Sequence, residues 1–404
     1  MADYDITTID TEIQDAIFSS FNSVVRIDDT HFILAYQGSN EGNIKTFSCD
    51  SDGDNITLID SFQFLATSPT YLSFIMIDTT HYALAYAGDG TDGFIKTFSI
   101  DGSYDNIALI DTEEHDAVYG EHNSLVKIDS THLALAYRGE YNYGYIKTFS
   151  IDSSADNITQ IDSLQHDTIC LTTSLVLIDS THLALAYRGG ASYYGYIKTF
   201  SFDGSYDNIT QIDSLEHDTR GQDNSLLLID STHLILACTG PTYAKGSITT
   251  FSIDSSQDNI TLIDRLEHEA SFCIYSSLAE IDSTHFVLGY AGAERDGHVK
   301  TFSIDGSYDN ITQLGSSEHD EANGTHNSIK MLGSDYCVLA YTGDGADGTL
   351  KTFSIAIPST GTNTQINIGD DWKEIDAMKI NIGDSWKVVA GIQQNISDTW
   401  KTVF

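Results

Sequence analysis

The sequence predicts an all-β fold, a seven-bladed β-propeller with four strands per blade, followed by a small C-terminal tail of β repeats. A glycine-led segment such as Gly144–Asp152 recurs every 51 residues, and its leading glycines are Gly42, Gly93, Gly144, Gly195, Gly246, Gly297 and Gly348. Each unit contains four short runs of β-branched and aromatic residues bounded by Gly, Asp, Ser and Asn, which are strand signals. Four strands per unit of about 40–50 residues is typical of a propeller.

The fourth unit illustrates the expected strands, which cover residues 174–178, 182–187, 196–202 and 208–212. In the second strand of the third unit, the large Leu133 and Leu135 alternate with the small Ala134 and Ala136. Both faces of the strand are apolar, as expected where a bulky face of one blade packs against a small face of the next.

The last unit stops after Ile355 and has no fourth strand, whereas residues 5–10 at the N-terminus match that missing strand. The N-terminal strand is therefore predicted to complete the last blade, which closes the ring and removes an open sheet edge. Over residues 1 to about 356 the chain resembles seven-bladed propellers that close by such a strand exchange. A β-helix or open solenoid is the alternative fold, and it would not need this closure.

We predict three regions: the propeller at 1–357, a linker at 358–365, and C-terminal β-hairpin repeats at 366–404. The segment Ile366–Lys373 recurs at 380–387 and, altered, at 394–401. Each copy reads as strand, Gly-Asp turn, strand. Because about 40 residues make a poor independent core, we expect the repeats to serve oligomerisation or attachment. The residues expected to carry it are Trp372, Trp386 and Trp400.

The composition is strongly acidic, with 59 Asp and Glu against 19 Lys and Arg and a net charge of −40. Such a surface repels phosphate backbones and anionic lipid, so we expect no nucleic-acid partner and no membrane insertion. The N-terminus lacks the features of a signal peptide, so we expect synthesis in the cytoplasm. The five cysteines are irregularly spaced and read as small buried apolar residues.

No cofactor and no metal site is predicted. The repeated histidines, such as His115 and His166, occur once per blade, so they cannot converge on one ion; we expect each to bond within its own blade. The acidic loop Asp50–Asp54 reads as hairpin-turn chemistry, with calcium binding as the alternative. The lysines of the third strands, such as Lys147, need partners if buried, and the repeated aspartate of the fourth strands, such as Asp162, is the expected one.

The loops between the second and third strands vary most among the units, and binding residues concentrate in such loops. Exposed Tyr and Arg suit sugar or protein recognition. The ligand-binding candidates are Arg138, Tyr141, Tyr143, Arg188, Tyr193, Tyr194, Tyr243 and Arg295. A repeated serine opens each first strand, beginning with Ser23, and could ring the channel mouth. Because a hydroxyl ring without a paired base is no nucleophile site, we predict no catalytic residues.

The Asn-Ile-Gly-Asp-x-Trp-Lys units of the tail resemble short C-terminal repeats in tail and structural proteins of tailed bacteriophages; the third copy departs from them, with Ser397 in place of Gly. This resemblance implies a non-enzymatic structural or adhesion protein of a virion or tail surface. Its propeller would bind a glycan or host receptor, and its tail would contact other virion or surface proteins in a homo-oligomer. A cell-surface or extracellular location is the alternative. The alternative functions are a free carbohydrate-binding propeller and, less favoured, a propeller glycosidase or lactonase.

Overall fold

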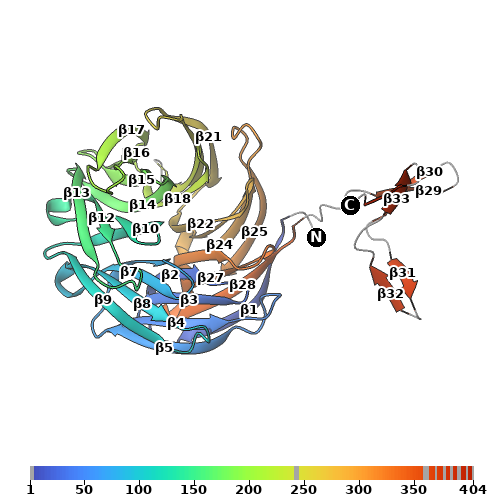
Figure 1. Ribbon diagram of the computed structural model, residues 1–404, viewed down its shortest axis with the longest axis horizontal. Coiled ribbons are helices and arrows are strands. Elements are labelled where there is room, and N and C mark those ends of the chain that lie inside the picture. Colours follow the sequence, from blue (N-terminus) through green and yellow to red (C-terminus); the bar gives the residue numbers. More distant parts are fainter. Residues whose placement is uncertain are drawn as a thin grey trace. The chain divides into compact units, whose positions relative to one another are not determined.

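Seven four-stranded antiparallel sheets form a ring in the first 356 residues of the computed structural model (Figure 1). The structure describes residues 4–240 and 245–357 and six short strands between residues 364 and 402. These strands belong to a second unit, residues 357–404. The predicted seven-bladed β-propeller with a tail of β repeats is confirmed. None of the helices in the described ranges is long and apolar enough to cross a membrane.

Blades 1 to 3 each run from an inner to an outer strand along the chain. Blade 1 contains β2 (Ser20–Arg26), β3 (His31–Gln37), β4 (Gly42–Ser48) and β5 (Thr57–Leu65). Blade 2 contains β6 (Thr70–Met76), β7 (His81–Ala87), β8 (Gly93–Ile100) and β9 (Ile107–Asp116). Blade 3 contains β10 (Glu121–Asp129), β11 (His132–Arg138), β12 (Gly144–Ser150) and β13 (Thr159–Asp167).

Blades 4 to 6 repeat this order. Blade 4 contains β14 (Cys170–Asp179), β15 (His182–Gly189), β16 (Tyr194–Ser201) and β17 (Thr210–Asp218). Blade 5 contains β18 (Gln222–Asp230), β19 (His233–Thr239), β20 (Gly246–Ile253) and β21 (Ile260–Glu269). Blade 6 contains β22 (Ile274–Asp282), β23 (His285–Ala291), β24 (Gly297–Ser303) and β25 (Thr312–Asp320). Short 3-10 turns join some second and third strands: η1 (Asp89–Thr91), η2 (Glu140–Asn142), η3 (Ala293–Arg295) and η4 (Asp344–Ala346).

Blade 7 contains β26 (Thr325–Met331), β27 (Tyr336–Thr342) and β28 (Gly348–Ile355), and its outer strand is β1 (Ile6–Asp15). The register runs from Ile6 opposite Ile355 to Asp15 opposite Gly348. This confirms the predicted closure and contradicts the open-solenoid alternative. The outer strands are longer than predicted, since β17 continues to Asp218 rather than ending at residue 212. Their last residues alternate polar and partly buried positions, so no apolar run marks them in the sequence.

The tail contains three antiparallel hairpins: β29 (Thr364–Ile368) with β30 (Asp371–Ile375), β31 (Lys379–Ile382) with β32 (Ser385–Val388), and β33 (Gln393–Ile396) with β34 (Thr399–Thr402). Their strands pair Asn367 with Trp372 and repeat this pairing in the other two hairpins. The prediction of two paired strands in each repeat is therefore confirmed, and the predicted Gly-Asp turns lie outside the described residues. The tryptophan side chains and residues 358–363 of the predicted linker lie outside the described part, and the oligomerisation role stays a prediction.

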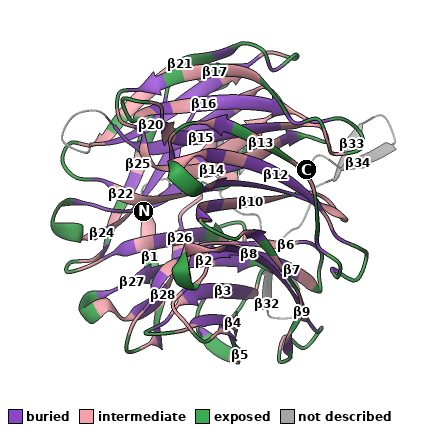
Figure 2. Cartoon of the chain, turned by 90° about the vertical axis from the view of Figure 1, so that its left-hand side faces the viewer, coloured by how far each residue is buried: buried purple, intermediate pink, exposed green. Residues whose placement is uncertain are grey.

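The core lies between neighbouring blades, and the second strands are buried on both faces (Figure 2). Leu133 and Leu135 of β11 pack toward blade 2, in a cluster with Ala83 and Ala85. Ala134 and Ala136 pack toward blade 4, in a cluster that includes Leu183 and Leu185. The predicted contact of a large face with a small face is thus present, and it leaves little void between sheets.

Three belts of hydrogen bonds join the blades. In the innermost belt the hydroxyl of each repeated serine accepts a backbone N–H of the next blade, as Ser23 does from Phe74 at 3.0 Å. This belt contains Ser23, Ser73, Ser124, Ser174, Ser225, Ser277 and Ser328. A second belt runs from third-strand threonines to backbone carbonyls, as from Thr148 to Tyr206 at 2.6 Å. The serines are therefore structural connectors, and their hydroxyls are already engaged.

The third belt joins the fourth-strand aspartates to the next blade, so these aspartates are not the lysine partners that the sequence predicted. The carboxylate of Asp162 accepts the backbone N–H of Ile209 in the next blade at 2.8 Å. The ammonium of Lys147 instead donates to the backbone carbonyl of His115, in the outer strand of the preceding blade, at 2.5 Å. The main partner of Lys147 is thus a carbonyl of the neighbouring sheet rather than the aspartate of its own blade, and Lys198 adds an ion pair with Asp167 of the preceding blade at 3.4 Å.

Candidate functional site

Every first strand carries a bulge at the same place, just before the repeated serine. In β10, for example, the register shifts between Glu121 and Ser124. The first bulged residue of each blade has a left-handed backbone, with φ between 49° and 55°. These residues are Phe21, Tyr71, His122, Thr172, Asp223, Tyr275 and His326. Left-handed aromatic and β-branched residues are uncommon and cluster at functional sites, and bulges re-aim side chains.

At four of the seven left-handed positions, the side chain of the following residue in the next blade donates a hydrogen bond to the backbone carbonyl of the left-handed residue. The amide of Asn123 donates to the backbone carbonyl of Tyr71 in the preceding blade at 3.3 Å. Asn224 donates likewise to the carbonyl of Thr172 at 2.9 Å. At these four positions the next blade therefore fixes the bulge through the backbone, so the side chains are free to differ.

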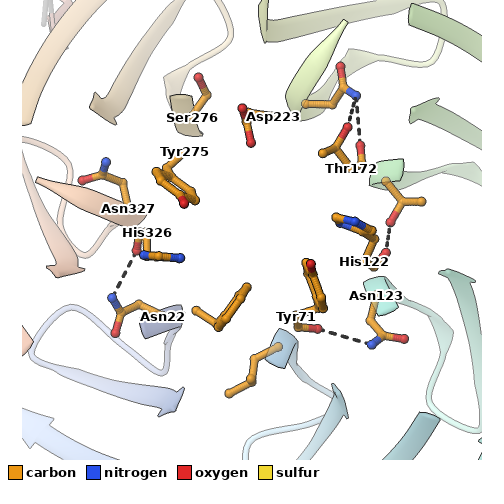
Figure 3. Close-up of a pocket in the computed structure, with 14 residues that line it drawn as sticks. Asn22, Tyr71, His122, Asn123, Thr172, Asp223, Tyr275, Ser276, His326 and Asn327 are labelled. Carbon is orange, nitrogen blue, oxygen red and sulfur yellow. Dashed lines mark hydrogen bonds between the residues drawn. The ribbon is translucent and has the colours of Figure 1, made fainter. Parts of the chain in front are cut away.

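The seven left-handed residues and their successors line one cavity of about 400 Å³, to which all seven blades contribute (Figure 3). The residues that follow them in the lining are Asn22, Leu72, Asn123, Thr173, Asn224, Ser276 and Asn327. This volume lies in the range of about 300–1,000 Å³ found for small-molecule sites. We call this cavity the mouth pocket.

Five consecutive left-handed positions form an aromatic arc around the mouth pocket. Tyr275 lies 4.2 Å from His326 between ring centroids, and His326 lies 4.9 Å from Phe21. Phe21 lies 4.9 Å from Tyr71, which lies 4.2 Å from His122. Such an arc offers flat faces and ring edges to a cyclic ligand. The two remaining positions are polar, so the pocket has an aromatic side and a polar side.

Asp223 is the carboxylate of the mouth pocket, and Figure 3 shows it across the cavity from Tyr71. Burial raises the pKa of Asp223 to about 6, although the Thr239 hydroxyl and the charges of Arg220 and Arg188 act in the opposite direction. The Thr239 hydroxyl lies 3.4 Å from the Asp223 carboxylate. A carboxylate with a pKa near neutrality can exchange protons at physiological pH, as a general base must.

The two histidines of the arc are neutral at pH 7. Burial, followed by the charge of Arg138, lowers the pKa of His122 to about 3. Burial and then Arg295 lower the pKa of His326 to about 4. The His326 ring is held by the hydroxyl of Ser20 at 3.2 Å. A neutral imidazole can donate or accept a hydrogen bond, so these rings add polar contacts without adding charge.

The predicted arginine candidates do not line the mouth pocket, but their charges act on residues that do. Arg138 forms an ion pair with Glu121 at 3.0 Å and stacks on Tyr119. Arg188 stacks on Tyr193 with 5.2 Å between its guanidinium carbon and the ring centroid. Arg295 occupies η3 with a left-handed backbone. The acidic chain thus places positive charge beside its cavity.

The described tyrosine candidates, Tyr141, Tyr143, Tyr193 and Tyr194, are not part of the mouth-pocket lining. Tyr141 is 72% exposed, and its ring lies 5.8 Å from that of Tyr143. Tyr193 covers Arg188, and Tyr194 begins β16. Tyr243 lies outside the described residues. The role of these tyrosines in binding stays a prediction.

The left-handed residues themselves were missed by sequence reasoning. They can be recognised in the sequence as the position two residues before the repeated serine, which holds five different residue types in the seven blades. Arg26, three residues after Ser23 on the first strand of blade 1, donates to the carbonyl of Leu332 at 2.7 Å.

The repeated histidines outside the pocket are structural, although their contacts differ from the expected ones. His166, His217 and His268 are packed with both ring nitrogens free of hydrogen bonds among the described residues. Burial lowers the pKa of each to about 3. Within the described ranges, no three His, Cys, Asp or Glu side chains group as metal ligands. In the Asp50 loop, the Asp50 carboxylate accepts the amide of Asn55 at 2.6 Å, as in a turn.

Residues 30–173 match the model of a family described as lactonase, 7-bladed beta-propeller. No curated protein sequence matches the chain. The periplasmic gluconolactonase of Pseudomonas aeruginosa is 15% identical with a TM-score of 0.54, over 72% of this chain and 82% of that chain. A proposed 6-phosphogluconolactonase of Bacteroides fragilis is 14% identical with a TM-score of 0.55, over 74% and 84%. The WD40 domain of Toxoplasma gondii coronin is 9% identical with a TM-score of 0.59, over 89% and 90%.

At these identities the likeness to solved structures shows the fold, while the family match bears on function. The match of residues 30–173 to this family points to an enzymatic lactonase propeller. The expectation of a non-enzymatic structural or adhesion protein of a virion is therefore wrong, as is the expectation that the chain has no catalytic role. The wrong expectation came from relying on the tail repeats. The positions at the channel mouth that differ from blade to blade were not considered.

Proposed function

We propose that this propeller is a lactone hydrolase and that the mouth pocket is its active site. The observation that carries the proposal is a carboxylate of raised pKa, Asp223, facing an aromatic arc in a cavity of about 400 Å³. The match of blades 1 to 3 to a lactonase family supports it. A lactone ring is flat around its ester and fits such an aromatic arc, while its carbonyl needs an attacking water and a donor.

Asp223 acts in this proposal as the general base. Its carboxylate takes a proton from a water molecule as the water oxygen bonds to the lactone carbonyl carbon. The tetrahedral intermediate then collapses with cleavage of the ring C–O bond, and the proton passes from Asp223 to the departing ring oxygen. Each turnover consumes one water and leaves one hydroxy acid. Positioned bases of this kind contribute about 10²- to 10⁴-fold to the rate.

The remaining lining supplies donors and offsets charge. The hydroxyls of Tyr71 and Tyr275 line the pocket and can donate to the oxygen on which negative charge develops. The product carries a new carboxylate beside Asp223. The positive charges of Arg188 and Arg220, which already lower the pKa of Asp223, reduce the repulsion between the two carboxylates.

The test is the hydrolysis of glucono-1,5-lactone above its spontaneous rate at pH 7. We expect Asp223→Asn to lower kcat at least about 100-fold with little change in thermal stability. Asp52→Asn, in an exposed turn between β4 and β5, is the matched control and should keep full activity. Wild-type protein that does not accelerate hydrolysis of this lactone or of 6-phosphogluconolactone, or an Asp223→Asn variant with unchanged kcat, would overturn the proposal.

A further inference from the structure

A second cavity of about 530 Å³ adjoins the mouth pocket between blades 1 and 2. The rings of Phe21 and Tyr71 line both cavities. They form a shared wall, so a ligand lying against the aromatic arc can continue over this wall into the second cavity. We call this cavity the side pocket. Its floor and rim come from the segment joining β5 to β6 and from η1.

The segment that builds the side pocket differs from its six counterparts. Residues 61–76 contain no charged side chain and no histidine, in a chain of net charge −40. Leu65 stands where blade 2 has Asp116, and Phe64 stands where blade 2 has His115. The acidic residue that usually ends the outer strand is therefore absent between blades 1 and 2. This removes one negative charge next to the cavity.

The chemistry of the side pocket selects a neutral, hydroxyl-rich ligand. Thr67, Ser68 and Thr70 are half-buried in its lining, and Asn40 joins them from the loop between β3 and β4. The lining contains two carboxylates, Asp89 and Glu121, and no Lys, Arg or His, so it disfavours an anionic group, while the Asp89 carboxylate can accept hydrogen bonds from ligand hydroxyls. The Glu121 carboxylate is already paired with Arg138 at 3.0 Å. Hydroxyl and amide groups beside aromatic rings match the alternating O–H and C–H surface of a sugar.

We propose that the side pocket is a subsite for a neutral sugar unit attached to the lactone, so that the substrate is a glycosylated aldonolactone. This inference rests on the proposed lactone hydrolysis at the mouth pocket for its catalytic part. The lactone ring occupies the mouth pocket near Asp223, and the glycosyl unit passes Phe21 and Tyr71 into the side pocket. The bond broken remains the ring ester, and the glycosidic bond stays intact.

The experiment compares two lactones and two matched variants. Wild-type protein should hydrolyse cellobiono-1,5-lactone with a kcat/KM about tenfold above that for glucono-1,5-lactone, as about 1.4 kcal/mol of added binding would give. Ala66→Trp fills the side pocket and should bring this ratio close to one. Ala117→Trp places the same side chain at the equivalent exposed position of blade 2, outside both cavities, and should keep the wild-type ratio.

Calorimetric binding of the two products, cellobionate and gluconate, separates this inference from the proposed function. Cellobionate should bind about tenfold more tightly, and Ala66→Trp alone should remove the difference. If the protein hydrolyses glucono-1,5-lactone but shows no preference in either assay, the side-pocket inference is overturned and the lactonase proposal stands. If neither lactone is hydrolysed yet the binding difference follows Ala66→Trp, the catalytic proposal fails and the sugar subsite remains. A preference for lactones with an acyl chain over cellobiono-1,5-lactone would also overturn the inference.

Discussion

The hydroxyl oxygen of Ser328 accepts a hydrogen bond from the backbone amide of Val24 at 2.9 Å, across the junction between the last and first blades. The same contact joins every other pair of neighbouring blades, so the inner ring is continuous. It lies directly beneath the bulges that carry the mouth-pocket residues. The stability of the ring and the shape of the site are therefore coupled at these serines.

Ser328→Ala should lower the free energy of unfolding by about 1–3 kcal/mol, because the buried amide of Val24 would lose its acceptor. Urea denaturation measures this difference. Ser39→Ala, in an exposed loop, is the control and should change stability by less than about 0.5 kcal/mol. Equal stability of the two variants would show that the serine belt does not stabilise the closure.

Deletion of residues 1–12 should lower the melting temperature strongly and promote aggregation. The deletion removes most of β1, and β28 would then present an unpaired edge. It also removes the backbone carbonyl of Tyr4, which accepts the Thr301 hydroxyl at 2.8 Å. Differential scanning calorimetry and light scattering provide the measurements. Removal of residues 1–3 alone should leave both unchanged, and an unaltered melting temperature after the longer deletion would contradict the closure.

Acid should destabilise the propeller through its buried histidines. Their pKa in the folded state, about 3 for His166 and His217, is lower than the ordinary value of about 6.5. The unfolded chain therefore binds more protons below pH 6.5, and stability falls as pH drops from about 6.5 toward 3. Each such histidine contributes a slope of about 1.4 kcal/mol per pH unit in this window.

His166→Phe tests this assignment, because Phe64 already occupies the equivalent place in blade 1. We expect the variant to lose less stability than wild type between pH 6.5 and 4, as measured by denaturation at each pH. His81→Phe, at a half-exposed turn histidine that pairs with Asp78, is the comparison and should not reduce the slope. An identical pH dependence of His166→Phe and wild type would contradict the assignment.

Lactone hydrolysis should rise with pH through a pKa near 6, since only the ionised Asp223 can accept a proton. Arg220→Gln removes a positive charge that favours the ionised form, so the acidic limb of kcat/KM should move to higher pH. Arg26→Gln serves as the control and should leave the limb in place. A limb that moves to lower pH in Arg220→Gln would contradict the role of Asp223 as the base.

Much of the fold could be predicted from the sequence because repetition exposes it. The spacing of glycines such as Gly144 marks third strands, and the lone strand at residues 5–10 marks the closure. Contacts between blades were harder to predict. Lys147 was assigned to Asp162 within its own blade, whereas its partner is the carbonyl of His115 in the neighbouring blade.

Blade 5 shows why partners across blades escape a comparison of repeats. Cys238 and Thr249 replace the usual Tyr and Lys, and Arg265 of the outer strand takes over both roles. Its guanidinium donates to the carboxylate of Asp218 at 2.8 Å and to the carbonyl of His217 at 2.6 Å. The three substitutions look unrelated in sequence and form one compensated contact in space.

The candidate site was only partly predictable. Arg138, Arg188 and Arg295 were identified from the variable regions, and their charges act on pocket residues, while their role in binding stays a prediction. The lining was missed because a comparison of repeats highlights the residues that all units share. The residues that line a central pocket are those that differ between units. Asp223 is the only carboxylate among the seven left-handed residues, and its position across one cavity from Tyr71 exists only when the ring is closed.

The seven bulges also have an evolutionary consequence. Each presents a side chain on the same left-handed backbone, and at four of them a group of the neighbouring blade holds that backbone, as Asn224 holds Thr172. A single codon change at one of these places alters the ligand chemistry while the frame persists. Duplication of one ancestral unit would thus have produced seven interchangeable sockets around a common axis. Ligand specificity can then change by substitution at one of these positions, while the blades and their contacts stay the same.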